Sequence, residues 1–190
     1  QGLPFGFQVS ALPIFLREQG VGLAAIGYST ALAAPWALKI LWAPLIERYG
    51  GQRGRRVRWI VPLQLGMAVG FIAASMLDIP DQLGMLMVVL LALNALAATQ
   101  DIAVDGLAVD ILPPSELGVG NAAQVVGYKV GMLLAGGVLV WASAWLGWSG
   151  SFLVMAALVS LVAALVARIH EDAPEPASED DPTETVGALL

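Results

Sequence analysis

Long apolar runs recur along residues 1–170 and constrain the fold more than any other feature of this sequence. A helix of about 20 mainly apolar residues is long enough to cross the hydrocarbon core of a bilayer. Hydrophobic residues make up 58% of the 190 positions and charged residues only 13%, whereas about 25% of the residues in soluble domains are charged. We therefore predict an all-α integral membrane protein.

Charged and turn-forming residues divide the apolar runs into six predicted membrane-spanning helices. These helices are expected at 1–16, 23–46, 57–77, 83–112, 117–146 and 151–167. Short connections make neighbouring helices antiparallel, so 1–170 should form one six-helix bundle. The chain opens on Gln1 inside an apolar run, without a charged flank or a cleavage site. We expect the sequence to begin within the first helix rather than with a signal peptide.

The distribution of Lys and Arg predicts the orientation of this bundle. The turn after the second predicted helix carries four arginines, which are Arg48, Arg53, Arg55 and Arg56. The loops on the opposite side carry only Arg17. Cytoplasmic loops are enriched in Lys and Arg, so the basic turn and both ends of the chain are expected in the cytoplasm.

The last twenty residues differ in composition from the rest of the chain. Residues 171–190 contain seven acids, three prolines and no Lys or Arg. This composition predicts a disordered cytoplasmic linker. Outside it, eight acids nearly balance nine bases, and such a balance gives no sign of nucleic-acid binding.

Three aspartates interrupt the apolar run of the fourth predicted helix. Asn94, Asp101 and Asp105 fall on one helix face, because their offsets of 7 and 4 residues are close to whole turns. Asp101 lies roughly 16 Å from the end of the helix at Pro113, near the middle of a bilayer core of about 30 Å. A carboxylate at this depth costs at least about 2.5 kcal/mol. We therefore predict a functional site, with Asp101 and Asp105 as the proton and coupling residues.

Two lysines lie at similar depths in other helices. By residue count, Lys129 matches the depth of Asp101, and Lys39 matches the depth of Asp105. These depths predict mutual neutralisation of the two acids by the two bases. Two interpretations stay open: the pairs only hold helices together, or the lysines also contact an anionic substrate while an aspartate titrates.

Neutral polar residues are concentrated in the first, second, fourth and fifth predicted helices. We expect these four helices to line a polar cavity, with the third and sixth facing lipid. The predicted neutral lining consists of Asn94, Gln100, Gln124 and Tyr128. Small residues at Gly127, Gly131 and Ala135 form a stripe that predicts close helix packing.

Charges near the cytoplasmic end predict a second polar group. Asp110 lies close to the Pro113–Pro114 helix stop, where it can meet an arginine of the basic turn at little desolvation cost. We predict a structural or gating salt bridge there. The candidate cytoplasmic gate consists of Glu47, Arg48, Arg55, Arg56 and Asp110.

No constellation of residues indicates an enzyme. The chain has no cysteine and one histidine, which excludes thiolate chemistry and gives no histidine-rich metal set. Asp101 and Asp105 lie on one helix without a carboxylate partner on a second helix, unlike a catalytic dyad. We expect no catalysis, no cofactor and no metal.

Several short motifs resemble a known family. The segments are GLP at 2–4, KILWAPL at 39–45, TQDIAVDG at 99–106, DILP at 110–113 and GYKVGM at 127–132. Their order and spacing resemble the AmpG-type muropeptide permeases and the related acetyl-coenzyme A transporters. The segment APLIERYG at 43–50, followed by Arg55 and Arg56, resembles the loop signature of the major facilitator superfamily, with Ala43 in place of its glycine and Glu47 in place of its aspartate.

The resemblance implies the N-terminal six-helix half of a transporter with twelve or more helices, located in a bacterial inner membrane. It further implies proton-driven import of anhydro-muropeptides, small anionic substrates, by alternating access with a C-terminal half. By position, Asp101 and Asp105 match the acidic motif of the family, Lys39 matches its base, and Lys129 stands where Arg is common. Alternatives are a carrier for acetyl-coenzyme A or another organic anion, and a membrane scaffold or receptor that transports nothing.

Overall fold

The computed structural model describes residues 2–50, 56–78 and 81–169. These residues form helices and short connections, and no strand occurs within them. The all-α prediction is therefore confirmed for this part of the chain. The predicted linker at 171–190, together with Arg53 and Arg55, lies outside the described residues.

The first helical segment is irregular in its middle. It consists of α1 (Gly2–Gly6), the π-helical η1 (Phe7–Ala11) and α2 (Leu12–Glu18). Pro13 stands at the start of α2, directly after the π-helical η1, and its missing backbone N–H removes one hydrogen bond from this continuous helical segment. The segment ends at Gly20, whose φ of 77° favours glycine.

The second helical segment alternates between two helix types. It consists of α3 (Leu23–Tyr28), η2 (Ser29–Ala33), α4 (Ala34–Leu38), η3 (Lys39–Leu41) and α5 (Ala43–Gly50). The two η elements are 3₁₀-helical. A 3₁₀-helix rises about 2.0 Å per residue instead of 1.5 Å, so Lys39 lies farther from the end of α5 than an ideal α-helix would place it.

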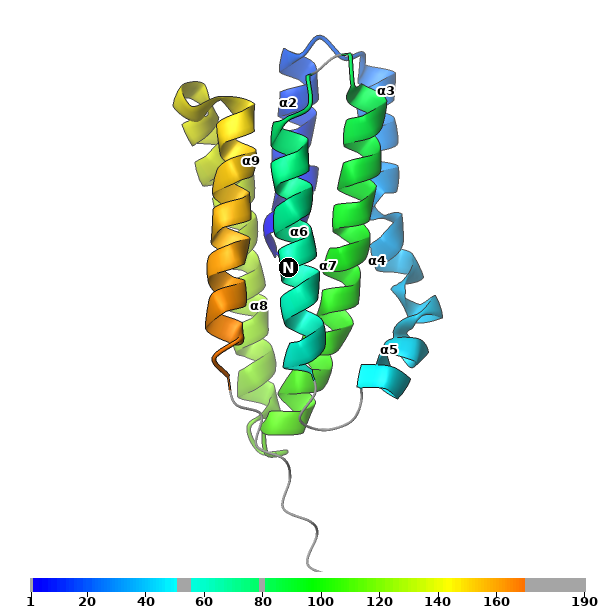
Figure 1. The fold of residues 1–190 in the computed structure, drawn as a ribbon, viewed down its shortest axis with the longest axis vertical. Coiled ribbons are helices and arrows are strands. Elements are labelled where there is room, and N and C mark those ends of the chain that lie inside the picture. The colour runs from blue at the N-terminus through cyan, green and yellow to red at the C-terminus, as the bar shows by residue number, and fades with distance from the viewer. Residues whose placement is uncertain (1, 51–55, 79–80, 170–190) are drawn as a thin grey trace, which may run out of the picture.

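The remaining helices are longer. They are α6 (Val57–Ser75), α7 (Leu83–Ile111), α8 (Leu117–Leu133), the π-helical η4 (Leu134–Val138) and α9 (Leu139–Val166). Within α9, Gly147 has φ 65° and ψ 174°. In Figure 1 the chain runs along the bundle through α8, reverses near this glycine and returns through the rest of α9. The reversal lies within the predicted connection between 146 and 151.

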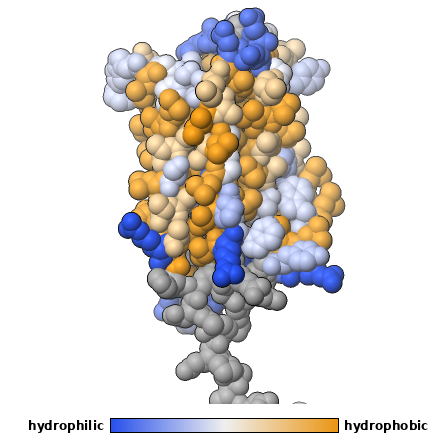
Figure 2. All heavy atoms as spheres, in the orientation of Figure 1, coloured by the Kyte–Doolittle hydropathy of each residue, from blue (hydrophilic) through white to orange (hydrophobic). Residues whose placement is uncertain are grey.

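Four stretches of the described residues are long and apolar enough to cross a membrane. They are Leu23–Leu41, Val57–Ser75, Leu83–Ile111 and Leu117–Val166. Figure 2 shows an apolar band on one face, between hydrophilic groups near the two ends of the bundle. The chain is therefore a multi-pass membrane protein.

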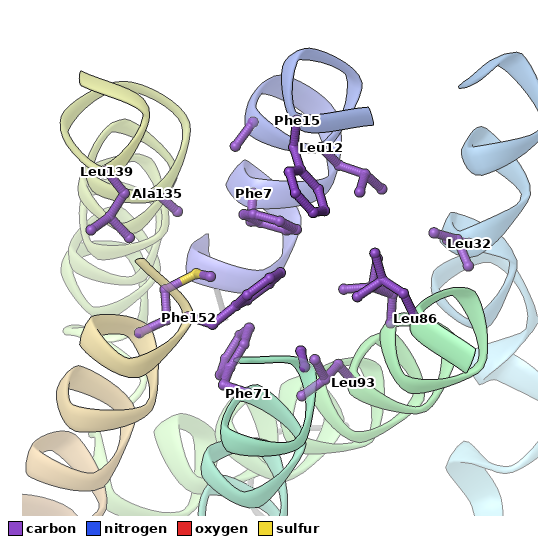
Figure 3. Packing of buried hydrophobic residues seen from close by; sticks show 14 of the residues in the cluster. Phe7, Leu12, Phe15, Leu32, Phe71, Leu86, Leu93, Ala135, Leu139 and Phe152 are labelled. Atoms are coloured by element: carbon purple, nitrogen blue, oxygen red, sulfur yellow. The ribbon is translucent and has the colours of Figure 1, made fainter. Parts of the chain in front are cut away.

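Aromatic side chains from three segments meet in the main core (Figure 3). The ring centroids of Phe7 and Phe152 are 5.0 Å apart, and those of Phe15 and Trp148 are 4.7 Å apart. Phe71 of α6 is fully buried beside them. The helices predicted to face lipid, α6 and α9, thus contribute one face to the core. Both also expose apolar side chains on another face, including Leu65, Val69, Leu153 and Leu161.

The first segment lies very close to α8 and η4, because glycines stand on both sides of the contact. A Cβ atom added to Gly6 would lie 2.6 Å from the Cα of Met132, and one added to Gly131 would lie 3.1 Å from the Cα of Gly2. Ala135 is fully buried. The small-residue prediction is confirmed for Gly131 and Ala135. It is wrong for Gly127, which lies one turn before Gly131 but has open space beside it among the described residues.

We expect Gly6→Ala to lower the free energy of unfolding by about 1–3 kcal/mol, since the added methyl group must push two backbones apart. The matched control is Gly127→Ala, which adds the same methyl group in open space and should stabilise the helix by about 0.5–1 kcal/mol. Thermal unfolding of the full-length protein in detergent measures both. Equal effects of the two variants would contradict this packing.

Candidate functional site

The central ion pair of the bundle joins the second helical segment to the middle of α7. Lys39 Nζ, in η3, donates a hydrogen bond to Asp101 Oδ2. The side chain of Lys39 is 32% exposed and that of Asp101 is 17% exposed. The predicted pairing of Lys39 with Asp105 is therefore wrong. Asp101 lies one turn deeper along α7 than Asp105, and the three residues of the 3₁₀ turn at Lys39 account for only about 1.5 Å of this difference.

Asp105 is exposed, and its partner is an amide rather than a lysine. Gln124 Nε2 of α8 donates a hydrogen bond to Asp105 Oδ1 at 3.3 Å. No ion pair of Lys129 occurs among the described residues. Neither pair suggested by the matched depths is therefore formed there, and Asp101 is neutralised by Lys39 instead of Lys129. Lys129 remains available to a ligand carboxylate.

A cavity of about 360 Å³ lies between α7 and α8 and is called the ionic cavity below. Its lining comprises Asp101, Asp105, Asn121, Gln124, Val125, Tyr128 and Lys129. Five residues predicted for the site thus meet there, from two helices that are antiparallel neighbours. The sequence analysis did not include Asn121 among the site residues, although it lies one turn before Gln124 on α8.

Asn94 and Gln100 are placed differently from the prediction. Asn94 is 2% exposed, accepts a hydrogen bond from Trp36 Nε1 at 3.0 Å, and donates one to the Leu90 carbonyl at 2.9 Å. Gln100 is buried and is not among the residues lining the ionic cavity. Asn94 shares the helix face of Asp101, but Trp36 covers it. Gln100 is turned away, because adjacent helical residues differ in direction by about 100°.

Two tryptophans of the second segment, which the sequence analysis did not select, fix that segment against α7. Trp36 donates to Asn94, and Trp42 Nε1 donates to Thr99 Oγ1 at 3.1 Å. Lys39 Nζ lies 5.8 Å from the centroid of the Trp36 ring, within the range of a cation–π interaction. The signal in the sequence was the spacing of three residues between Trp36 and Lys39, which places both on one face.

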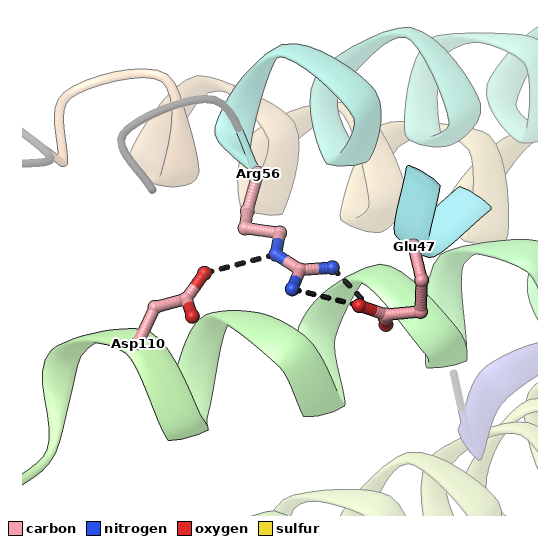
Figure 4. A network of polar contacts seen from close by, with 3 residues as sticks. All are labelled: Glu47, Arg56 and Asp110. Carbon is pink, nitrogen blue, oxygen red and sulfur yellow. Dashed lines mark hydrogen bonds and ion pairs between the residues drawn. The ribbon is translucent and has the colours of Figure 1, made fainter. Parts of the chain in front are cut away.

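A second polar group lies where α5, α7 and the start of α6 meet (Figure 4). This is the end of the bundle that the sequence predicts to face the cytoplasm. Arg56 NH1 and NH2 donate to the Glu47 carboxylate at 3.2 and 3.0 Å, and Arg56 Nε donates to Asp110 Oδ2 at 3.0 Å. The predicted salt bridge between Asp110 and the basic turn is confirmed, with Arg56 as the arginine. Arg48 is exposed and Arg55 lies outside the described residues.

The guanidinium of Arg56 is only 5% exposed and lies directly over Gly106. A Cβ atom at Gly106 would lie 2.4 Å from Arg56 Cζ, so the glycine makes room for the bidentate contact. Burial alone would lower the pKa of Arg56, but the hydrogen bonds and charges of Glu47 and Asp110 outweigh it and raise the pKa above its ordinary value. The arginine therefore stays charged and ties three helices together.

Within the described ranges, no group of three or more His, Asp or Glu side chains is arranged to hold a metal ion. The chemistry of the ionic cavity is instead that of fixed charges. Its charged groups are the neutralised carboxylate of Asp101, the exposed carboxylate of Asp105 and the ammonium of Lys129. The volume of the cavity is large enough for part of a small organic ion.

Comparison with known proteins places the chain in a family. Residues 1–190 match the family model of the Major Facilitator Superfamily. The chain is 34% identical over 177 residues to the anhydromuropeptide permease of Escherichia coli K12, an alignment covering 92% of this chain and 35% of that protein. It is 27% identical over 176 residues to the putative transporter AmpG 4 of Rickettsia felis, covering 90% of this chain and 42% of that protein.

The chain thus spans 35% and 42% of the length of these two relatives. The family model matches its whole length, and the helices of the described part carry the apolar surface expected of a membrane bundle. This chain belongs to the major facilitator superfamily.

Proposed function

We propose that the chain is the N-terminal part of a secondary active transporter that imports anhydro-muropeptides and is driven by protons. The observation that carries the proposal is the ionic cavity, in which a Lys39–Asp101 pair lies beside Asp105 and the unpaired Lys129. Charged residues inside membrane helices usually mark a substrate or ion pathway. Relatives named anhydromuropeptide permease and putative transporter AmpG support this substrate.

The four charged residues have distinct proposed roles. Lys129 and Lys39 attract the carboxylates of the substrate. A substrate carboxylate that competes for Lys39 leaves Asp101 without its ammonium partner, and an unpartnered carboxylate in apolar surroundings takes up a proton. Asp105, held by Gln124, passes protons between Asp101 and the cavity. Substrate binding and proton uptake are coupled in this scheme because both act on Lys39 and Asp101.

We further propose that the bundle crosses a bacterial inner membrane six times, with both ends in the cytoplasm. Four candidate spans, a reversal at Gly147 and the first segment of Gly2–Glu18 support this number. No residue of α8 is buried. A second, C-terminal six-helix half would cover this face and complete the ionic cavity.

In the proposed alternating access, the two halves rock about the substrate between them. Arg56 pairs with Glu47 of α5 and with Asp110 of α7 and so joins these two helices at one end of the bundle. It holds the cytoplasmic ends of three helices together and opens when that side opens. Glu47, Arg56 and Asp110 therefore form the gate, with Arg48 and Arg55 as the remaining predicted members.

Uptake by the full-length protein in membrane vesicles tests this function. Labelled anhydro-muropeptide should accumulate when an inward proton gradient is applied, and an uncoupler should abolish the accumulation. Gradient-independent uptake would contradict proton coupling. If the protein takes up acetyl-coenzyme A or another organic anion but no muropeptide, the ionic cavity binds that anion instead. Binding without any uptake would favour a receptor or scaffold.

A further inference from the structure

Three aromatic rings from three helical segments form a row beside the ionic cavity. The ring centroids of Phe5 and Trp36 are 5.9 Å apart, and those of Phe5 and Tyr128 are 5.8 Å apart. Tyr128 also lines the ionic cavity. The rings of this aromatic row are partly exposed, so apolar ring surface borders the charged groups.

Polar contacts fix the position of Trp36 within this row. Trp36 donates its indole N–H to the buried Asn94, whose own amide is held by the Leu90 carbonyl. Lys39, which is paired with Asp101, lies near the other part of the Trp36 ring. Burying polar groups to orient a tryptophan is not needed for simple packing, since a leucine would fill the space without a hydrogen-bond partner.

Phe5 also lines a second cavity of about 350 Å³, between the first two helical segments. Its polar side chains are Gln8, Ser29 and Thr30. Ser29 Oγ and Thr30 Oγ1 donate to carbonyls of their own helix at 2.7 and 2.8 Å. Gln8 is 6% exposed, and its Oε1 has no hydrogen-bond partner among the residues that the structure describes.

A buried acceptor without a partner costs free energy of about 1–3 kcal/mol, and a ligand with an O–H or N–H donor would recover it after a small rotation of the side-chain amide. Aromatic faces pack well against the C–H faces of a pyranose ring. Phe5 thus lines a neutral site with a hydrogen-bond acceptor and contacts Tyr128, which lines the ionic cavity. Together the two cavities fall in the volume range of binding sites for small molecules.

We propose that the aromatic row and Gln8 bind the sugar of the transported molecule, while the ionic cavity binds its charged peptide part. The inference rests on the proposed function, and it assigns substrate specificity to Phe5, Gln8, Trp36 and Tyr128. One amphipathic ligand thus occupies two neighbouring sites. Its hydroxyl and acetamido groups donate hydrogen bonds to Gln8, and the faces of its sugar rings pack against the aromatic row. Its carboxylates bind Lys129 and Lys39.

Competition experiments with the full-length protein in vesicles test this division. Uptake of labelled anhydro-muropeptide is measured against two unlabelled competitors, the peptide-free sugar part and the sugar-free peptide. Both should inhibit the wild type. In Phe5→Leu we expect the inhibition constant of the sugar to rise at least tenfold and that of the peptide to stay within twofold. Lys129→Met should show the reverse pattern.

Two further variants control for folding. Phe5→Tyr keeps the ring and should retain inhibition by the sugar. Trp141→Leu removes a tryptophan that is exposed on the outside of the bundle and should leave both inhibition constants unchanged. Equal shifts for both competitors in Phe5→Leu, or no shift for the sugar, overturn the division while leaving the proposed function intact. Absence of any uptake by the wild type overturns both.

Discussion

Replacing Lys39 by Met should abolish uptake and destabilise the protein at the same time. The variant leaves Asp101, which is mostly buried, without its ammonium partner. Breaking a buried ion pair by removing one partner costs about 3–5 kcal/mol, and we expect the lower value because Lys39 is one-third exposed. Uptake should be lost for a separate reason, because the proposed anion contact of Lys39 is gone and Asp101 no longer has the partner for which the substrate competes.

The double variant Lys39→Met with Asp101→Asn separates the structural role from the functional one. It removes both charges, so thermal unfolding in detergent should recover most of the stability lost in Lys39→Met. Uptake should stay as low as in the single variant, because the anion contact and the titrating group are both gone. Recovery of uptake together with stability would show that the pair only holds the helices together.

Replacing Arg56 by Gln should have the second-largest effect. The guanidinium satisfies Glu47 and the largely buried Asp110 from one position. Without it, Asp110 loses its charged partner, and the ends of α5, α6 and α7 are no longer joined. We expect a loss of about 2–4 kcal/mol in the free energy of unfolding, within the range for buried charged pairs that lose one partner.

Arg48→Gln is the matched control, because Arg48 belongs to the same basic turn but is exposed. Its effect on stability should stay within about 0.5 kcal/mol. Thermal unfolding of the three full-length proteins gives the comparison. If Arg56→Gln and Arg48→Gln behave alike, the Glu47–Arg56–Asp110 group contributes nothing beyond general surface charge.

The helical architecture was predictable because each apolar run is long and is closed by charged or glycine-rich turns. Gly147 illustrates this: the sequence predicts a reversal between 146 and 151, and a residue at positive φ makes it. The irregular parts were not predictable in the same way. The 3₁₀ turn at Lys39 and the π-helical η1 and η4 depend on packing between segments, and residue counting assumes an ideal α-helix.

In the site, too, features within one helix were predictable from the sequence, whereas contacts between helices were not. The face shared by Asp101 and Asp105 follows from helical periodicity, and both line the ionic cavity with Gln124, Tyr128 and Lys129. Which base pairs with Asp101 depended on how the second segment packs against α7, through contacts such as those of Trp36 and Trp42, so the predicted pairing of Lys39 with Asp105 was wrong. The burial of Asn94 depended on Trp36, which reaches it across 58 positions of sequence, a contact that periodicity within one helix does not reveal.

The proton gradient-driven uptake of anhydro-muropeptide by the full-length protein, with Asp105→Asn beside the wild type, tests the central claim most directly. Asp105 is exposed to the ionic cavity and accepts one hydrogen bond from Gln124, so the variant should fold while losing a titratable group. We predict uptake by the wild type that an uncoupler abolishes, and loss of gradient-driven uptake in the variant. Equal gradient-driven uptake by both proteins would contradict a role of Asp105 in coupling.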